Sequence, residues 1–352
     1  MYRLGDSVVF TLYGESHSEY IGGILDGIPK EMEIDTDLID KELTLRRPSK
    51  GIGTPRTEPD NVEFLSGIRD GRTTGESIHY TIRNTDTDNS KYDVFNRTPR
   101  PGHADLPALV KSPDHKIKGG NQFSGRLTVS VVVAGCIARQ FISRYGITVA
   151  AFTRSIGKIK DDKERTFDDA AVSKCHATRA ASADLDSMMT KEILDASAEG
   201  DSVGGVVECI AVGLPIGFGG TWFDSLDAEI ARAVVAIPAC KAVEFGKGFG
   251  LAGMKGSESN DPYYYDNGIK LRSNNMGGIL GGMSDGAPLV FRAAFKPTPS
   301  IGKEQDTVDL EQMTNTKVKV EGRHDPCIVP RAAIVVESVT CLVIADQIVR
   351  GL

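Results

Sequence analysis

Three of the six histidines in the chain lie in short segments rich in glycine, proline and charged residues. His17 closes the sequence GESH, His103 lies within RPGHAD, and His324 lies within GRHDPC. Imidazole gains and loses a proton near neutral pH, so these positions suit proton transfer. A single histidine is more often a hydrogen-bonded structural residue. The prediction of acid–base chemistry therefore depends on the three contexts occurring together.

Arginines and glycine-rich segments indicate a phosphorylated, polyanionic substrate. Guanidinium groups bind phosphate and carboxylate through paired hydrogen bonds. Glycine-rich turns, such as GGNQFSGR at residues 119–126 and SNNMGGILGG at 273–282, add backbone N–H donors. The candidate anion-binding residues are Arg46, Arg47, Arg56, Arg126 and Arg323. The alternative for Arg46 and Arg47 is a pair of solvated charges in a loop.

Composition argues against several other classes of protein. The net charge is −7 with no basic tail, whereas nucleic-acid-binding domains are usually basic. The six cysteines form no C-x-x-C pair, so no metal site or redox dithiol is indicated. We interpret several of them as buried thiols of a reducing compartment, which predicts a cytoplasmic protein. No run of about 18 apolar residues is evident, so no membrane span is expected.

One dinucleotide-like motif is interpreted as a false match. Residues 248–253 read GFGLAG, which fits G-x-G-x-x-G. The motif is meaningful only where a helix follows it, and the next residues, MKGSESNDPYYYDNG, are polar and rich in helix breakers. Ser273 stands near the position where an acidic ribose ligand is expected. The sequence therefore gives no support to a dinucleotide-binding domain.

The elements that position these residues follow from hydrophobic periodicity. The patterns predict strands at 7–12, 21–25 and 78–82 and helices at 35–45, 128–143, 184–198, 227–237 and 337–349, with a long polar loop at 85–105. The 128–143 segment is apolar on nearly every face, which predicts a buried central helix.

A faint internal echo links the two halves of the chain. GGILDGIP at 22–29 resembles GGVV at 204–207 followed by GLP at 213–215. DLIDKEL at 37–43 resembles DSLDAEI at 224–230, in the same order and at nearly the same offset. A duplicated α+β unit explains the echo, and chance similarity of short apolar patterns explains it equally well.

The segments GESH, RPGHAD, SN…GGILGG, KPT and GRHDP, in this order, resemble the chorismate synthase family. They extend from residue 14 to residue 326, so the resemblance covers essentially the whole chain. It implies an α+β fold in a single domain, residues 1–352, in which central helices lie between two antiparallel sheets with internal pseudo-duplication. It also implies a homotetramer.

The resemblance implies an enzyme that eliminates phosphate from 5-enolpyruvylshikimate 3-phosphate in an anti-1,4 sense. The product is chorismate, and reduced FMN is required without net redox change. His17 would act as an acid toward the substrate, with Ser16 in a relay. His103 would protonate or stabilise the reduced flavin, and Asp325 would lie near flavin N5.

The resemblance also assigns binding residues. The substrate would be bound by Arg46, Arg47, Arg126 and Arg56. The flavin would be bound by Gln122, Phe123, Ser124, Pro238, Ala239, Gly281, Lys296, Pro297, Thr298, Pro299, Ser300 and Arg323.

Three departures from the family pattern leave alternatives open. Ser18 replaces a usual glycine, Leu45 stands where a third arginine is frequent, and Gln122 replaces a charged residue within an altered 121–127 segment. One alternative is a diverged, non-catalytic flavin- or phosphate-binding protein on the same scaffold. A second is a bifunctional enzyme that also reduces its flavin with NADPH. A third is a flavin oxidoreductase with net redox turnover.

Overall fold

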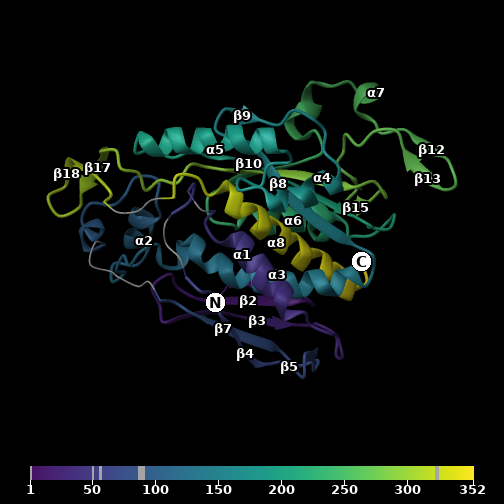
Figure 1. Ribbon diagram of the computed structural model, residues 1–352, viewed down its shortest axis with the longest axis horizontal. Helices are drawn as coiled ribbons and strands as arrows, with labels where there is room; N and C mark the ends of the chain where they lie inside the picture. Colours follow the sequence, from purple (N-terminus) through teal and green to yellow (C-terminus); the bar gives the residue numbers. More distant parts are fainter. Residues whose placement is uncertain (1, 50, 55–57, 86–91, 322–324) are drawn as a thin grey trace.

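The computed structural model describes residues 2–49, 51–54, 58–85, 92–321 and 325–352. A layer of helices lies between two five-stranded sheets (Figure 1). The first sheet has the order β1 (Tyr2–Leu4), β2 (Val9–Gly14), β3 (Tyr20–Asp26), β7 (Ile78–Arg83) and β4 (Val62–Ser66). The second has the order β11 (Cys240–Phe245), β16 (Leu289–Phe295), β10 (Gly205–Val212), β8 (Thr148–Ile156) and β9 (Ile159–Lys160). Every strand pair in these sheets is antiparallel.

Four helices form the central layer, and two more cover the outer side of the second sheet (Figure 1). The central helices are α1 (Thr36–Arg46), α3 (Thr128–Ser143), α6 (Leu226–Val235) and α8 (Val329–Arg350). The outer helices are α4 (Phe167–Val172) and α5 (Ala183–Ala198). Smaller elements are α2 (Asp105–Lys111), α7 (Gly256–Ser259) and the hairpins β5–β6 (Ile68–Arg69, Arg72–Thr73), β12–β13 (Tyr263–Tyr265, Ile269–Leu271), β14–β15 (Ile279–Leu280, Met283–Ser284) and β17–β18 (Gln305–Asp309, Thr314–Val318).

The centre of the layer is the contact between α3 and α8. Nearly every residue of α8 up to Gln347 is buried, and α3 is buried on most of its surface. The two backbones approach closely at Gly135, where an added Cβ would lie 2.3 Å from Cβ of Ser338. Glycine is required there because any side chain would force the helices apart. Helix α8 has Pro330 in its first turn and ends at Gly351, which has a left-handed backbone conformation.

The internal duplication is confirmed by the order of the elements. In chain order, β2, β3, α1, β4, β7 and α3 correspond to β8, β10, α6, β11, β16 and α8. Read from the opposite edge, the second sheet runs β9-β8-β10-β16-β11, which matches β1-β2-β3-β7-β4 strand for strand apart from the edge strands β1 and β9. The echo therefore marks one α+β unit used twice, and the predicted sandwich is confirmed.

Several predicted boundaries are wrong. Helix α8 begins at Val329 rather than at 337, and β2 covers Val9–Gly14 rather than 7–12. The long polar loop ends in the short helix α2, and the strands of the second sheet were not predicted. Strands β8 and β10 are buried on both faces, because α4 packs on their outer side, so they lack the alternation that marks a strand.

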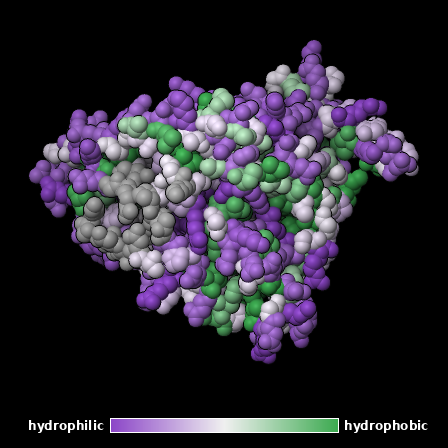
Figure 2. Space-filling view, viewed as in Figure 1, coloured by the Kyte–Doolittle hydropathy of each residue, from purple (hydrophilic) through white to green (hydrophobic). Residues whose placement is uncertain are grey.

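Among the residues that the structure describes, two helical segments are long and apolar enough to cross a membrane, which corrects the expectation that no such run exists. They are Val329–Arg350, with mean hydropathy 1.9, and Gly125–Ser143, with mean hydropathy 1.3. Their apolar windows are 89% and 72% buried inside the fold, as in the core helices of soluble proteins. The face of the molecule in Figure 2 is mainly hydrophilic, with scattered hydrophobic patches.

A buried ionic network ties the central helices to the second sheet. Glu337 of α8 accepts hydrogen bonds from the backbone N–H of Ala151 at 2.8 Å and from Nζ of Lys174 at 2.9 Å, and it pairs with Arg139 of α3. Arg139 Nε also lies 2.7 Å from a carboxylate oxygen of Glu42 on α1. Burial alone raises the pKa of Glu337, but Arg139, Lys174 and the Ala151 N–H outweigh it and lower the pKa below its usual value.

We expect Glu337→Gln to lower the free energy of unfolding by about 3–5 kcal/mol, because it removes a buried carboxylate that pairs with two partly buried cations, leaving Lys174 without this partner and Arg139 with Glu42 alone. Denaturant unfolding at fixed protein concentration measures the change. The matched control is Glu304→Gln, which removes an exposed ion pair with Lys317 and should cost less than about 1 kcal/mol.

The pH dependence of Glu337 has a definite sign. Its pKa is lower in the folded protein, so its stabilising contribution is present above the unfolded-state pKa and is lost as the pH falls through the folded-state pKa. Equal destabilisation by Glu337→Gln and Glu304→Gln would contradict this role for the network.

Candidate active site

A cavity of about 710 Å³ lies where the four central helices end. Its lining includes the C-terminal ends of α1 and α6, at Arg46 and Val235, and the N-terminal ends of α3 and α8, at Thr128 and Ile328. Small-molecule sites typically enclose about 300–1,000 Å³. Because helix N-termini carry partial positive charge, two of these four ends favour an anionic ligand.

Arg46 and Arg126 are buried in one wall of the cavity and share the carboxylate of Asp60. Arg126 also lies 3.1 Å from Glu58 and donates from Nε to the Asn84 side chain at 3.0 Å. Arg46 donates from Nε to Thr128 Oγ1 at 3.1 Å and from Nη2 to the carbonyl of Arg126 at 3.2 Å. Burial, together with repulsion from Arg331, lowers the pKa of Arg46 to about 9, so it remains a cation at neutral pH.

Arg47 lies at the edge of the same wall and is half-exposed. Its Nη2 donates to the carbonyl of Pro59, and its Nε lies 4.0 Å from Asp60. Asp60 therefore faces three arginines and is itself buried, with a left-handed backbone (φ +51°). Such a conformation is costly for a non-glycine residue and persists where its surroundings hold it.

The loop that carries His103 is held at both ends. Arg100 and Asp105 form a buried two-point ion pair, with Nε–Oδ2 at 2.7 Å and Nη2–Oδ1 at 2.8 Å. Between them, His103 Nε2 and Ser300 Oγ are hydrogen-bonded at 2.7 Å, and Lys296 donates to the carbonyl of Gly102. The RPGHAD and KPTPS segments, nearly 200 residues apart in sequence, therefore form one wall of the cavity.

Ser16 and His17 stand behind the glycine pair 119–120 that lines the cavity. The Gly120 N–H donates to Ser16 Oγ at 3.3 Å. A Cβ added at Gly119 would lie 2.6 Å from His17 Nε2, and the His17 ring packs edge-on against Tyr92. Arg100 reaches this region too, because its Nη2 donates to the Gly119 carbonyl at 2.9 Å. One ion pair thus supports both histidine loops.

Asp325 lines the cavity beside the start of α8. Its Oδ2 is paired with Arg331 Nη1 at 2.5 Å. Its Oδ1 is buried and has no hydrogen-bond partner among the described residues. Burial raises the pKa of Asp325, although the positive charge of Arg331 opposes the shift. Thr298 Oγ1, on the wall that carries His103, is likewise buried without a partner within the described ranges.

The structure brings most of the predicted site residues into this cavity. Its walls include His103, Asp325, Arg46, Arg47, Arg126, Gln122, Phe123, Ser124, Pro238, Ala239, Lys296, Thr298, Pro299 and Ser300. Pro297 lies in the same segment but does not line the cavity. Gly281 does not line it either: it follows β14, and the next residue, Gly282, packs against Ser225 at the opposite end of α6. Arg56 and Arg323 lie outside the described residues, as does His324.

Several lining residues were not predicted: Glu58, Asp60, Tyr92, Arg100, Lys241 and Arg331. Arg331 had a usable signal, since Pro330 marks the first turn of a helix and therefore the place of the next residue. Arg100 and Asp105 bracket His103 in sequence, which is also a usable signal. Asp60 has no such signal in the sequence. Arg126 is distant in the chain, and no sequence pattern links Asp60 to Arg46 or Arg47.

The three departures are accommodated differently. Ser18 Oγ donates to the carbonyls of Glu15 at 2.8 Å and Tyr20 at 2.6 Å, so it closes the GESH turn. Leu45 packs against the hydrophobic core. Gln122 and the half-exposed Phe123 line the cavity, which places the altered segment at the ligand site itself.

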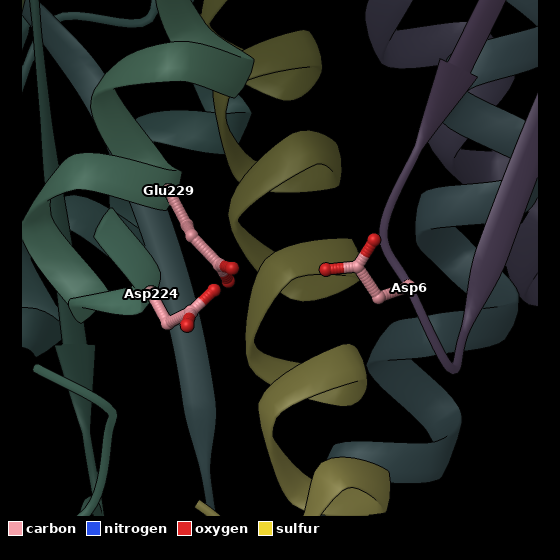
Figure 3. Close-up of side chains that lie close together, drawn as sticks. All are labelled: Asp6, Asp224 and Glu229. Atoms are coloured by element: carbon pink, nitrogen blue, oxygen red, sulfur yellow. The ribbon is translucent and has the colours of Figure 1, made fainter.

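A second group of acidic side chains lies away from the cavity. Asp6, Asp224 and Glu229 converge beside α8 (Figure 3). Arg350 already binds them, with its Nη atoms 2.6 Å from Glu229, 3.0 Å from Asp224 and 3.7 Å from Asp6. This group therefore fastens the end of α8 to the N-terminal segment and to α6, and it gives no support to a metal site.

Comparison with known proteins agrees with the fold and the cavity. The sequence profile of the family described as chorismate synthase matches residues 8–349. A chorismate synthase of Korarchaeum cryptofilum is 45% identical over 97% of this chain and 95% of its own length. One of Thermococcus kodakarensis is 44% identical over 98% and 97%, respectively. The crystal structure of a chorismate synthase superposes with a TM-score of 0.79 at 27% identity, over 99% of this chain and 93% of the other.

The sandwich of duplicated units and its cavity of arginines, histidines and a buried carboxylate define an enzyme, a lyase that acts on a small molecule. The chain belongs to the chorismate synthase family.

We expect Gly119→Ala to lower kcat by about 10²-fold. The added Cβ would lie 2.6 Å from His17 Nε2, so the imidazole ring must move, and a small misplacement of a catalytic group is enough for such a loss. The matched control is Gly71→Ala, which has the same left-handed backbone (φ +73° against +66°) but no atom within 4 Å of the added Cβ. Steady-state kinetics and thermal unfolding separate the two effects. Equal losses of activity in the two variants would show that backbone strain, and not His17, is responsible.

Proposed function

We propose that this chain catalyses the 1,4-elimination of phosphate from 5-enolpyruvylshikimate 3-phosphate, giving chorismate, with reduced FMN bound in the same cavity. The observation that carries the proposal is the convergence in one cavity of His103, Asp325 and the arginines 46, 47 and 126, in a chain that belongs to this family. These residues come from both halves of the duplicated fold.

The charge of the cavity suits the substrate, which carries one phosphate and two carboxylates. Arg46 and Arg47 present cations at the end of α1, and Lys241 and Lys296 present cations on the opposite wall. Burial is the larger cause that lowers the pKa of Lys296, and repulsion from the nearby cation Lys241 lowers the pKa further. A polyanion relieves that repulsion, so binding is favoured where the cations meet.

The elimination breaks the C–O bond to phosphate and removes one proton from the ring. His17, supported by Ser16, supplies a proton on the substrate side as the phosphate leaves. Asp325 would lie near flavin N5 and help it act as the base, and its Oδ1, which has no hydrogen-bond partner within the described part of the chain, is the oxygen that would finally take up the proton. His103, whose Nε2 is hydrogen-bonded to Ser300 Oγ, would protonate or stabilise the reduced flavin on the wall that these two residues line.

The cavity fits reduced FMN as well. Thr298 Oγ1 is a buried polar atom that needs a partner, and the half-exposed ring of Phe123 offers a stacking surface. The residues proposed to hold the flavin are Gln122, Phe123, Ser124, Pro238, Ala239, Lys296, Thr298, Pro299 and Ser300. The chemistry that reduced FMN would supply when bound there is transient electron donation during cleavage of the C–O bond, without net oxidation.

A non-catalytic flavin- or phosphate-binding protein is the alternative, and the altered segment at Gln122 and Phe123 is the observation that favours it. Against it stand His17, His103 and Asp325, all present and held by specific contacts. A protein that only binds its ligand does not need the buried carboxylate of Asp325, in which one oxygen is paired and the other has no hydrogen bond among the described residues.

We further propose a cytoplasmic homotetramer. Trp222 and Phe223 are 85% and 90% exposed, with their rings 6.4 Å apart. Trp222 also has a left-handed backbone (φ +56°), which is costly for a bulky residue. Adjacent exposed aromatics held in a strained turn are typical of surfaces that another subunit covers.

An anaerobic assay tests the proposed function. Protein mixed with dithionite-reduced FMN and 5-enolpyruvylshikimate 3-phosphate should release phosphate and chorismate in equal amounts over many turnovers, without net flavin oxidation. His17→Ala is the matched variant and should turn over about 10²–10⁴-fold more slowly. Flavin binding without product would favour the binding protein, and consumption of one reductant per turnover would favour an oxidoreductase.

Sedimentation equilibrium tests the assembly. The expected mass is four times the 37.8 kDa of one chain. Trp222→Ser with Phe223→Ser should lower the mass, whereas Met313→Ser, which removes an equally exposed side chain from the β17–β18 hairpin, should not. A wild-type protein that sediments as a monomer would contradict the proposal.

A further inference from the structure

Arg331 is the residue that joins the two halves of the proposed site. It lies in the first turn of α8 and lines the cavity. Its Nη1 pairs with Oδ2 of Asp325 at 2.5 Å, and its Nε donates to the backbone carbonyl of Arg46 at 3.0 Å. A single guanidinium thus contacts the proposed proton acceptor on one side and the C-terminal end of α1, which carries the proposed substrate arginines, on the other.

The hydrogen bond from Arg331 to the Arg46 carbonyl also satisfies a backbone acceptor at the end of α1. A carbonyl in the last turn of a helix has no partner within the helix. Arg331 satisfies the carbonyl of Arg46, the last residue of α1, and its charge suits the negative end of that helix. The planar guanidinium offers donors in fixed directions, so the positions of Arg46 and Asp325 are set relative to each other.

The contact with Asp325 distinguishes the two carboxylate oxygens. Oδ2 is occupied by Arg331, whereas Oδ1 is buried and has no hydrogen bond among the residues described. A guanidinium on one oxygen leaves the other as the site at which a proton can be taken up. In Asp325, Oδ2 therefore anchors the carboxylate to Arg331, and Oδ1 is the oxygen available for proton transfer.

The groups that face Asp325 are few within the described ranges. On its own segment, the Cys327 thiol is kept neutral because burial raises its pKa to about 12. The N–H groups of Cys327 and of Thr54 lower the pKa of Asp325, and Arg331 on α8 is the neighbouring cation. Arg46 on α1 is connected to the carboxylate through Arg331. Burial is the main influence that raises the pKa of Asp325, and Arg331 is the first of those that lower it.

We propose that Arg331 is a positioning residue of the reaction: it holds Oδ2 of Asp325, leaves Oδ1 free to accept the proton, and fixes the carboxylate relative to Arg46. The assignment rests on the proposed function for the catalytic use of Asp325, but the contact between the two side chains is independent of it.

Loss of Arg331 has a predictable sign. Without the cation, the buried carboxylate becomes harder to ionise, so its pKa rises further. The base must be ionised to accept a proton, so the acidic limb of the kcat profile moves to higher pH. A residue with a merely structural role would lower activity at all pH values alike.

The experiment compares Arg331→Gln with wild type. Infrared pH-difference spectra report the protonated carboxyl band of Asp325, which Asp325→Asn identifies by removing it. In Arg331→Gln the band should titrate at least about one pH unit higher than in wild type, and the acidic limb of kcat should move with it. The KM for substrate should change by less than about threefold, because Arg331 acts through Asp325.

Two variants control for charge and folding. Arg165→Gln removes a comparable arginine–aspartate pair, with Asp161, outside the cavity and should leave the band and the profile unchanged. If Arg331→Gln does not fold, Arg331→Lys replaces it; the point charge cannot reproduce the fork, so a smaller shift in the same direction is expected.

Three results would overturn the proposal: an unmoved band in the variant tested, a uniform loss of activity at all pH values, or a raised KM with an unchanged pH profile. The last would make Arg331 a substrate ligand. If the wild-type protein forms no chorismate, the proposed function fails, and the infrared titration still decides whether Arg331 controls Asp325.

Discussion

The structure depends on the close contact of α3 with α8. Gly135 has no side chain, and Ser338 of α8 occupies the space that a side chain at this position would need. Because these two helices run side by side with their N-terminal ends at the same cavity, α1 and α6, packed against them, bring their C-terminal ends to it as well. The contact therefore sets where the four helix ends meet, and the loops that carry the remaining candidate residues close around them.

Electrostatic compensation explains why so many charges can be buried around one ligand site. Asp60 neutralises part of the charge of Arg46 and Arg126, and Asp325 neutralises Arg331. Isolated burial of any of these groups would cost several kcal/mol, roughly the whole stability of a domain. Because the buried ion pairs hold the guanidinium groups in fixed positions before a ligand binds, the entropic cost of ordering these side chains on binding is smaller.

Much of the fold could be predicted from local patterns, and the exceptions have physical reasons. The bounds of α3 were correct because its apolar residues continue from one end to the other. The start of α8 was placed too late, at Glu337, because Pro330 was not used as the mark of a first helical turn. Strands β8 and β10 of the second sheet were missed because strands buried on both faces lack the alternation that distinguishes a strand from a buried helix.

The site was predictable where chemistry is concentrated in short motifs, as around His103 and Lys296, which the structure places in one wall. Asp60 was not predictable as a site residue. Its significance comes from arginines that the folded chain brings near, and a lone aspartate in sequence carries no such information.

The duplication makes the cavity two-sided. The α1 half contributes the arginine wall, and the equivalent end of α6 contributes Val235 to Ala239, which is uncharged. One copy of the unit therefore surrounds its helix end with paired arginines, while the uncharged helix end of its twin is followed by Lys241. A cavity built from two unlike copies can present charged and uncharged surface to a ligand at the same time. A single unit with one surface could not do so.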